Sequence, residues 1–366
     1  MGNKISTTEI LTGNSLHILK TLPDESVNCV ITSPPYYGLR DYGTGTWEGG
    51  DPNCPHYRTT KINQGNSTGH KHMDEMGQSV GDAIYKTVCP KCGAIRIDEQ
   101  VGLEETPEEY IESLVNIFRE VKRVLKDDGT VWLNIGDSYA SNTHSNNNFN
   151  YEGGRGSNNP HIATTNVIKD DVKQKDLIGI PWMLAFALRA DGWYLRQDII
   201  WHKPNPMPES VKDRCTKSHE YIFLLSKSPR YYFDNESIKE PTLTYDNSVR
   251  NRDETKLNNT PGRTKMGGLK TNNYTERNKR DVWTISTKPF DGAHFATFPE
   301  ELVIPCLLAG CPEKGTVLDP FAGAGTVGVV CKKNNRNFIG VELNPEYVKI
   351  AEKRIEDTPE PKTKLW

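Results

Sequence analysis

The chain has 366 residues and a formal net charge of -3, so the molecule as a whole is not a basic nucleic-acid binder. Any nucleic-acid contact must therefore come from a local patch. The hydrophobic content of 35% supports one large domain with insertions, or two domains. No apolar stretch approaches the ~20 residues of a membrane span, and the N-terminus lacks the apolar centre of a secretory signal. The eight cysteines are therefore expected in a reducing cytoplasm.

Predicted strands and helices alternate along the chain. Strands are expected at 10–14, 27–31, 131–135, 194–201 and 221–225, followed by a strand-loop-helix-strand unit at 316–343. Helices are expected at 15–22, 106–128, 181–190, 300–308 and 345–355. The second helix has the clearest start, because Thr106 can cap it, Pro107 suits the first turn and Glu109 completes a capping box; Gly129 is expected to end it. The alternation predicts an α/β fold with a Rossmann-like, doubly wound, mostly parallel sheet.

Two loops from opposite ends of the chain each follow a predicted buried strand. Thr32-Ser33-Pro34-Pro35-Tyr36 follows the strand at 27–31, and Asp319-Pro320-Phe321-Ala322-Gly323-Ala324-Gly325-Thr326 follows the strand that starts at 316. In open α/β sheets, ligands bind at the carboxyl ends of such strands. We therefore expect both loops to open onto one crevice.

The first loop has the chemistry of a clamp for a flat ring. Pro34 and Pro35 each fix φ and remove an N–H donor, which holds the peptide extended. The Ser33 hydroxyl and the Pro34 carbonyl can each accept one proton of an exocyclic amine, and Tyr36 offers a flat face for stacking. Without Tyr36 and the second loop, Ser-Pro-Pro would be interpreted as a plain proline turn.

The second loop predicts a nucleoside cofactor. Gly323-x-Gly325-x-x-Gly328 formally matches the dinucleotide fingerprint, and Glu342 stands where an acidic residue would bind ribose hydroxyls. Asp319 argues against a dinucleotide, because a carboxylate beside the loop would repel a pyrophosphate. It suits the ammonium and sulfonium groups of S-adenosylmethionine. The alternative is a tight strand-to-helix turn that binds nothing.

Taken together, these residues give the chain a resemblance to amino-methylating DNA methyltransferases of the permuted beta arrangement. In that family a Ser/Asp-Pro-Pro-Tyr catalytic loop precedes a Phe-x-Gly-x-Gly cofactor loop. The matching segments are 33–36, 200–205, 294–299, 319–325 and 340–342. The resemblance implies a methyltransferase fold and S-adenosylmethionine as cofactor. The residues that it assigns to the cofactor are Asp319, Phe321, Gly323, Gly325, Thr326, Glu342, Asn14 and Phe298, with Phe295 as an alternative to Phe298.

The resemblance also implies the reaction. Ser33, Pro34, Pro35 and Tyr36 would be catalytic, with a direct methyl transfer onto the amine of a base flipped out of double-stranded DNA. Serine at the first motif position is commoner in N4-cytosine enzymes, and aspartate in N6-adenine enzymes. Cytosine is therefore predicted, with adenine as the alternative. A second alternative is a DNA-binding protein that keeps the fold without turnover.

Four residues of a polar insertion predict a metal site. Cys54-x-His56 and Cys89-x-x-Cys92 offer four ligands, and the second pair has knuckle spacing. Four protein ligands leave no open position, so a bound zinc would be structural. His70 or His72 can replace one of the ligands, and unpaired surface cysteines are the alternative.

The expected organisation is a permuted methyltransferase domain with a small zinc-binding insertion and a loop-rich target-recognition region. The segments are 1–42, 101–240 and 283–356 for the catalytic domain, 43–100 for the insertion, 241–282 for the basic recognition segment and 357–366 for a tail. Lys203 and the basic residues Arg263, Lys265 and Lys270 are expected to contact DNA. A second copy of the chain and a cognate restriction endonuclease remain open as partners. No membrane is expected, and the setting is the cytoplasm of a prokaryotic or phage-infected cell.

Two further polar positions carry weaker expectations. Asp137, after the strand at 131–135, either borders the pocket or caps the following turn. Glu220, directly before the strand at 221–225, is expected to be structural.

Overall fold

An eight-stranded sheet forms the centre of the computed structural model, which describes residues 7–38, 42–59, 82–84, 87–140, 172–241, 276–288 and 298–360. Within the described residues, only β9 runs antiparallel to its neighbours in this sheet. The strands, in their order across the sheet, are β1 (Thr8–Thr12), β14 (Asn337–Glu342), β13 (Thr316–Asp319), β2 (Val27–Thr32), β7 (Leu125–Ile135), β9 (His219–Ser226), β8 (Tyr194–His202) and β12 (Val282–Thr284). The predicted mostly parallel sheet is confirmed.

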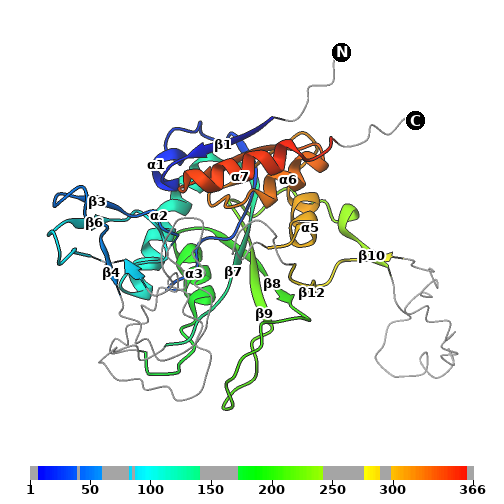
Figure 1. Ribbon diagram of the computed structural model, residues 1–366. Helices are drawn as coiled ribbons and strands as arrows, with labels where there is room; N and C mark the ends of the chain where they lie inside the picture. Colours follow the sequence, from blue (N-terminus) through cyan, green and yellow to red (C-terminus); the bar gives the residue numbers. More distant parts are fainter. Residues whose placement is uncertain are drawn as a thin grey trace, which may run out of the picture.

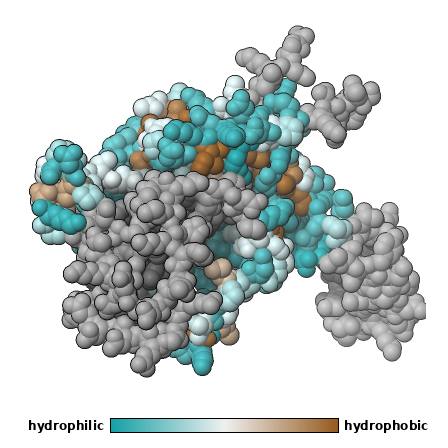
Figure 2. Space-filling view, viewed as in Figure 1, coloured by the Kyte–Doolittle hydropathy of each residue, from teal (hydrophilic) through white to brown (hydrophobic). Residues whose placement is uncertain are grey.

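Helices cover both faces of the sheet, so the sheet is doubly wound (Figure 1). The first group is α1 (Ser15–Leu19), α2 (Pro107–Val124) and α3 (Ile180–Ala190), and the second is α5 (Glu300–Gly310), α6 (Thr326–Lys333) and α7 (Pro345–Glu356). Each group packs over its own cluster of buried hydrophobic residues. Where the face of the molecule seen in Figure 2 is coloured, it is mostly hydrophilic, with hydrophobic residues in patches. Among the described helices, none has the length and apolar character that a membrane crossing requires.

Short antiparallel ribbons lie outside the main sheet. β3 (Thr46–Glu48) pairs with β6 (Ile95–Ile97), β4 (Tyr57–Thr59) with β5 (Asp82–Ile84), and β10 (Glu240–Pro241) with β11 (Glu276–Arg277). A single 3-10 turn, η1 (Glu236–Ile238), lies between β9 and β10 in the described chain. None of these elements was predicted, because strands of two or three residues are too short to show an alternating pattern. β3, β4 and β6 project beside α2, away from the sheet (Figure 1).

The start of α2 agrees with the prediction and its end does not. The Thr106 side chain accepts a hydrogen bond from the Glu109 backbone N–H at 3.1 Å, as a cap should. The helix ends at Val124, however, and Gly129 lies inside β7. A Cβ at Gly129 would stand 2.5 Å from Leu125 Cδ1 and 3.0 Å from the Asn28 carbonyl oxygen. Gly129 is thus needed for close packing between strands. In the sequence, the same glycine looks like the end of a helix.

Candidate active site

The two predicted loops begin side by side. Strands β2 and β13 are parallel neighbours, with Cys29 opposite Val317 and Val30 opposite Leu318. At their carboxyl ends the Thr32 hydroxyl donates a hydrogen bond to Asp319 Oδ1 at 2.7 Å, and both residues are buried. Tyr36 and Phe321, further along the two loops, pack against the same hydrophobic core. The two loops therefore begin at one edge of the sheet, and the single crevice onto which both are expected to open stays a prediction.

The Ser-Pro-Pro-Tyr loop is held by hydrogen bonds from three other elements. The Tyr36 phenol lies 2.6 Å from Glu220 Oε2 on β9 and 3.2 Å from Asn134 Oδ1 on β7, and the Ser33 hydroxyl also lies 3.2 Å from Asn134 Oδ1. The Tyr110 hydroxyl of α2 donates to the Pro35 carbonyl at 2.9 Å. Burial, together with the charge of Glu220, raises the pKa of Tyr36 well above its usual value. The phenol therefore keeps its proton and acts as a donor.

Two glycines make room for this loop. A Cβ at Gly136, just beyond β7, would stand 2.6 Å from Tyr36 Cε2. Gly102 has a φ of +99°, and a Cβ there would lie 3.1 Å from the Tyr36 carbonyl oxygen. The ring of Tyr36 thus lies against Gly136 and its backbone against Gly102, where a larger residue would not fit.

The cofactor loop carries a buried carboxyl group at its start. Asp319 Oδ1 accepts hydrogen bonds from Thr32 and from the Phe321 backbone N–H at 3.0 Å. Burial raises the pKa of Asp319 to about 7, with smaller opposing effects of these two hydrogen bonds. Both hydrogen bonds from described residues end on Oδ1, which leaves Oδ2 for a cationic group.

Glu342 joins the end of β14 to the glycine loop. Its Oε2 accepts from the Gly323 N–H at 2.8 Å and its Oε1 from the Asn344 N–H at 2.9 Å. Burial raises the pKa of Glu342 as well. Gly325 has a φ of +76° and begins α6, where a Cβ would stand 2.8 Å from Ala351 Cβ. A buried acidic group, Asp319, and a partly buried one, Glu342, therefore flank a loop whose backbone approaches α7 closely.

The other predicted cofactor residues lie around these loops. Asn14 Oδ1 caps α1 by accepting the Leu16 and His17 N–H groups at 2.9 and 3.3 Å. Thr326 is the first residue of α6. Phe298 lines a small hollow with Thr32 and Asn134. These placements leave their contacts with a cofactor as predictions.

The sequence reasoning missed two residues of this site, Asn134 and Glu220. A polar residue inside the buried strand β7 was the available signal for Asn134, which is only 5% exposed. Glu220 was interpreted as structural, whereas its carboxylate contacts Tyr36, Asn134 and Lys203. Asp137, for which two roles were open, caps α3: its Oδ1 accepts from the Gly179 and Ile180 N–H groups at 2.9 and 3.1 Å.

The predicted DNA-contacting residues are only partly described. Lys203 follows β8, forms an ion pair with Glu220 and places Nζ 4.3 Å from the centroid of the Trp201 ring. Arg263, Lys265 and Lys270 lie outside the described residues, as does Phe295. The DNA contacts of all four basic residues stay predictions.

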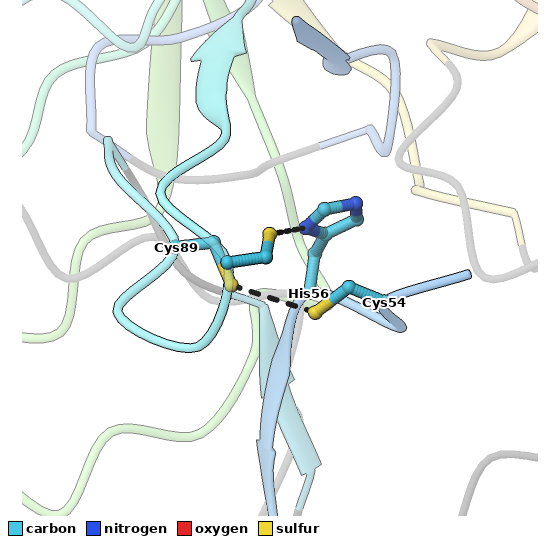
Figure 3. A group of neighbouring side chains, drawn as sticks. Cys54, His56 and Cys89 are labelled. Carbon is cyan, nitrogen blue, oxygen red and sulfur yellow. Dashed lines mark hydrogen bonds between the residues drawn. The ribbon is translucent and has the colours of Figure 1, made fainter. Parts of the chain in front are cut away.

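The predicted metal ligands come together at the side of the molecule that carries β3 and β6. The ligand atoms of Cys54, His56, Cys89 and Cys92 all lie within 4.8 Å of one another. Cys54 Sγ is 3.7 Å from Cys89 Sγ (Figure 3), and Cys92 Sγ is 3.6 Å from His56 Nδ1. The Trp47 ring stacks on His56, with ring centroids 4.3 Å apart. The alternative ligands His70 and His72 lie outside the described residues.

The cluster of Cys54, His56, Cys89 and Cys92 has side chains that could hold a metal ion. Three thiols and one imidazole are a donor set that zinc prefers. The backbone N–H groups of Ala94 and Asp51 lower the pKa of Cys92, which favours the thiolate form that binds metal.

The fold places this protein among the α/β proteins with a methyltransferase-like sheet, and its Ser-Pro-Pro-Tyr loop begins beside a glycine-rich loop. A family model described as DNA methylase, for N6- and N4-methyltransferases, matches residues 27–353. The chain belongs to this family, whose members are S-adenosylmethionine-dependent DNA amino-methyltransferases. The resemblance seen in the sequence is thereby confirmed, and DNA is the substrate class.

Two relatives agree with this assignment, and a solved structure shares the fold. The chain is 43% identical over 352 residues to the Type II methyltransferase M.Cfr9I of Citrobacter freundii, covering 94% of this chain and 87% of that protein. It is 40% identical over 349 residues to M.SmaI of Serratia marcescens, covering 95% and 90%. The PvuII DNA methyltransferase (cytosine-N4-specific) has a similar fold, with a TM-score of 0.54 and 18% identity over 96% of this chain and 87% of that one.

Proposed function

We propose that the protein methylates the N4 amino group of a cytosine that is flipped out of double-stranded DNA at a specific sequence. The observation that carries the proposal is the hydrogen bond between Thr32 and Asp319, which joins the clamp loop to the cofactor loop. The preference for cytosine over adenine rests on Ser33 at the first clamp position. The fold shared with the PvuII enzyme does not enter this choice.

The clamp residues would hold and orient the target amine. When bound, S-adenosylmethionine supplies an electrophilic methyl group. Ser33 Oγ and the Pro34 carbonyl accept one amine proton each, which turns the nitrogen lone pair away from them and toward the methyl group. The Tyr36 ring stacks on the base and compensates part of the cost of removing it from the helix.

The second loop and the adjacent end of β14 would hold the cofactor through two acidic groups, Asp319 and Glu342. Asp319 Oδ2 suits the ammonium group of the cofactor, and Glu342 suits the ribose hydroxyls. Gly323 and Gly325 allow the backbone to approach the ligand. Phe321, Thr326, Asn14 and Phe298 complete the proposed binding site.

We also propose that Cys54, His56, Cys89 and Cys92 bind one structural zinc ion in the insertion at 43–100. Four protein ligands exclude water from the metal, so this site would take no part in methyl transfer. Strands β3 and β6 of the insertion each have two exposed residues and one partly buried residue, and the metal would supply stability that this ribbon lacks.

The proposal is tested by the chemical identity of the product. The protein is incubated with unmethylated duplex DNA and methyl-labelled S-adenosylmethionine, and the digested nucleosides are identified by mass spectrometry. N4-methylcytosine is expected in the wild-type reaction, and Ser33→Ala should form it more slowly while keeping cofactor affinity. N6-methyladenine would establish the adenine alternative. No methylated nucleoside, with cofactor still bound, would favour a DNA-binding protein without turnover.

The basic segment 241–282 is the proposed DNA-contacting region. Neutralising Arg263, Lys265 and Lys270 together should weaken binding to all sequences. The dependence of log Kd on log salt should fall by about 0.9 for each DNA phosphate that these side chains no longer neutralise. An unchanged salt dependence would place the DNA surface elsewhere. A second copy of the chain and a restriction endonuclease of the same specificity remain the proposed protein partners.

A further inference from the structure

A continuous line of contacts leads from Lys203 to the Ser33 hydroxyl. The Lys203 ammonium pairs with Glu220 Oε1, and these side chains are only 18% and 14% exposed. Glu220 Oε2 accepts a hydrogen bond from Asn134 Nδ2 at 3.2 Å, and Asn134 Oδ1 lies 3.2 Å from Ser33 Oγ. The β8–β9 pairing sets Glu220 opposite Trp201, which brings Lys203 to the carboxylate.

The partners of Asn134 leave its amide a single orientation. Nδ2 faces two oxygens that can only accept, Glu220 Oε2 and the Tyr221 carbonyl at 3.1 Å. Turning the amide round would set Oδ1 against both oxygens and break both bonds. Oδ1 is therefore fixed on the side of Ser33, where it can only accept.

The Tyr36 proton does not compete with Ser33 for this acceptor. Tyr36 has one proton, and its hydroxyl lies 2.6 Å from the Glu220 carboxylate but 3.2 Å from Asn134 Oδ1. A charge-assisted bond at the shorter distance is the stronger of the two. Asn134 Oδ1 is thus left to the Ser33 proton, and the lone pairs of Ser33 Oγ are left for another donor.

We propose that Glu220, held by Lys203, is a positioning residue that fixes Ser33 as a hydrogen-bond acceptor and so selects a base that presents an amine. The inference rests on the proposed function and deepens it. A base with a carbonyl at the same position would face only acceptors in this clamp, because the Ser33 proton is already committed. Lys203 then acts through Glu220 rather than through a DNA phosphate.

Glu220→Gln removes the carboxylate that fixes the hydrogen bonds of Asn134 and Tyr36, with little change in the shape of the side chain. A glutamine amide offers its own N–H protons, so it can turn a donor toward Asn134 or Tyr36 and release the fixed order of donors and acceptors. Lys203→Met leaves the Glu220 carboxylate without its cationic partner. This change should also release the fixed order of donors and acceptors. Lys203→Arg keeps the charge and should restore function.

The test is a double-mutant cycle between Glu220→Gln and Ser33→Ala, measured as the single-turnover rate of methyl transfer to duplex DNA. With Ser33 present, Glu220→Gln should lower the rate by about tenfold or more. In the Ser33→Ala background the same change should cost less than about twofold, because its effect passes through Ser33. A general structural role of Glu220 would give equal losses in both backgrounds and would overturn the proposal.

Binding measurements separate the remaining outcomes. Cofactor and DNA affinities of Glu220→Gln and Lys203→Met should stay within about threefold of wild type, with Lys203→Arg close to wild type in rate. The matched control is Glu209→Gln, which breaks another ion pair of the β8–β9 connection, that with Arg214, and should leave the rate unchanged. If Lys203→Met keeps its rate but lowers the salt dependence of DNA binding by about one unit, Lys203 is a phosphate contact and the proposal is wrong. A wild-type chain that forms N4-methylcytosine upholds the proposed function whatever the cycle returns, whereas an inactive one overturns both.

Discussion

The carboxyl group of Asp319 is buried, and this burial should make cofactor binding depend on pH. Burial raises the pKa of Asp319 to about 7, so below pH 7 the free protein carries a proton there. A cationic ligand group beside Oδ2 favours the carboxylate, and binding should then expel the proton. Affinity for S-adenosylmethionine should therefore rise with pH up to about 7 and level off above it.

Calorimetry in buffers of different ionisation enthalpy measures this proton directly. At pH 6 we expect close to one proton released per cofactor bound, and none above pH 8. Asp319→Asn should bind more weakly and release no proton at either pH. Proton release that persists in Asp319→Asn would assign the titration to another group, with Glu342 as the first to examine.

At the scale of single residues, the sequence predicted the site residues that lie at the ends of strands. It missed two site residues that lie within neighbouring strands. Ser33, Tyr36 and Asp319 lie at strand ends, where position along the chain is enough to predict a shared edge. Asn134 and Glu220 meet only because β7 and β9 pair antiparallel, with Asn134 opposite Ile222. No local pattern specifies that register, so neither residue could be assigned to the clamp beforehand.

At the scale of elements, the start of α2 depends on a capping residue that can be recognised in the sequence. The Thr106 hydroxyl satisfies the Glu109 N–H, one of the donors that the first turn of a helix leaves without a partner. Thr106→Ala should lower the free energy of unfolding by about 1 kcal/mol, measured by urea denaturation. Glu112→Ala, at an exposed position of the same helix, is the control and should change it by less than about 0.5 kcal/mol. Equal changes in both variants would show that the cap contributes nothing specific.

The other end of α2 shows where local signals fail. Gly129 looks like a helix stop, but β7 already begins at Leu125, opposite Val27 of β2. Strand pairing across the chain overrides the helical pattern of the preceding residues, and only the folded sheet reveals it.

At the scale of the molecule, the alternation of strands and helices was sufficient to predict a doubly wound sheet, whereas the attachment of the insertion was not predictable. The insertion leaves the catalytic domain beside the clamp loop, where the Gly38 N–H donates to the Gly102 carbonyl at 2.9 Å. Tyr42, directly before the insertion, also contacts the start of α7, because Asn344 Nδ2 donates to the Tyr42 carbonyl at 3.2 Å. The two clusters of buried hydrophobic residues, by contrast, belong to the sheet and its helices.

This arrangement predicts what removal of the metal should do. Cys92→Ser should lower the zinc content, expected to be one ion per chain, and make residues 43–100 sensitive to proteases, because the cluster that joins Cys54 and His56 to Cys89 is then opened. The sheet keeps its own cores, so cofactor affinity should change by less than about threefold. Cys215→Ser is the matched control, since Cys215 is exposed and lies outside the cluster, and it should retain the metal and the protease resistance. Full zinc content in Cys92→Ser would remove Cys92 from the site, while collapse of cofactor binding would mean that the insertion and the sheet fold as one unit.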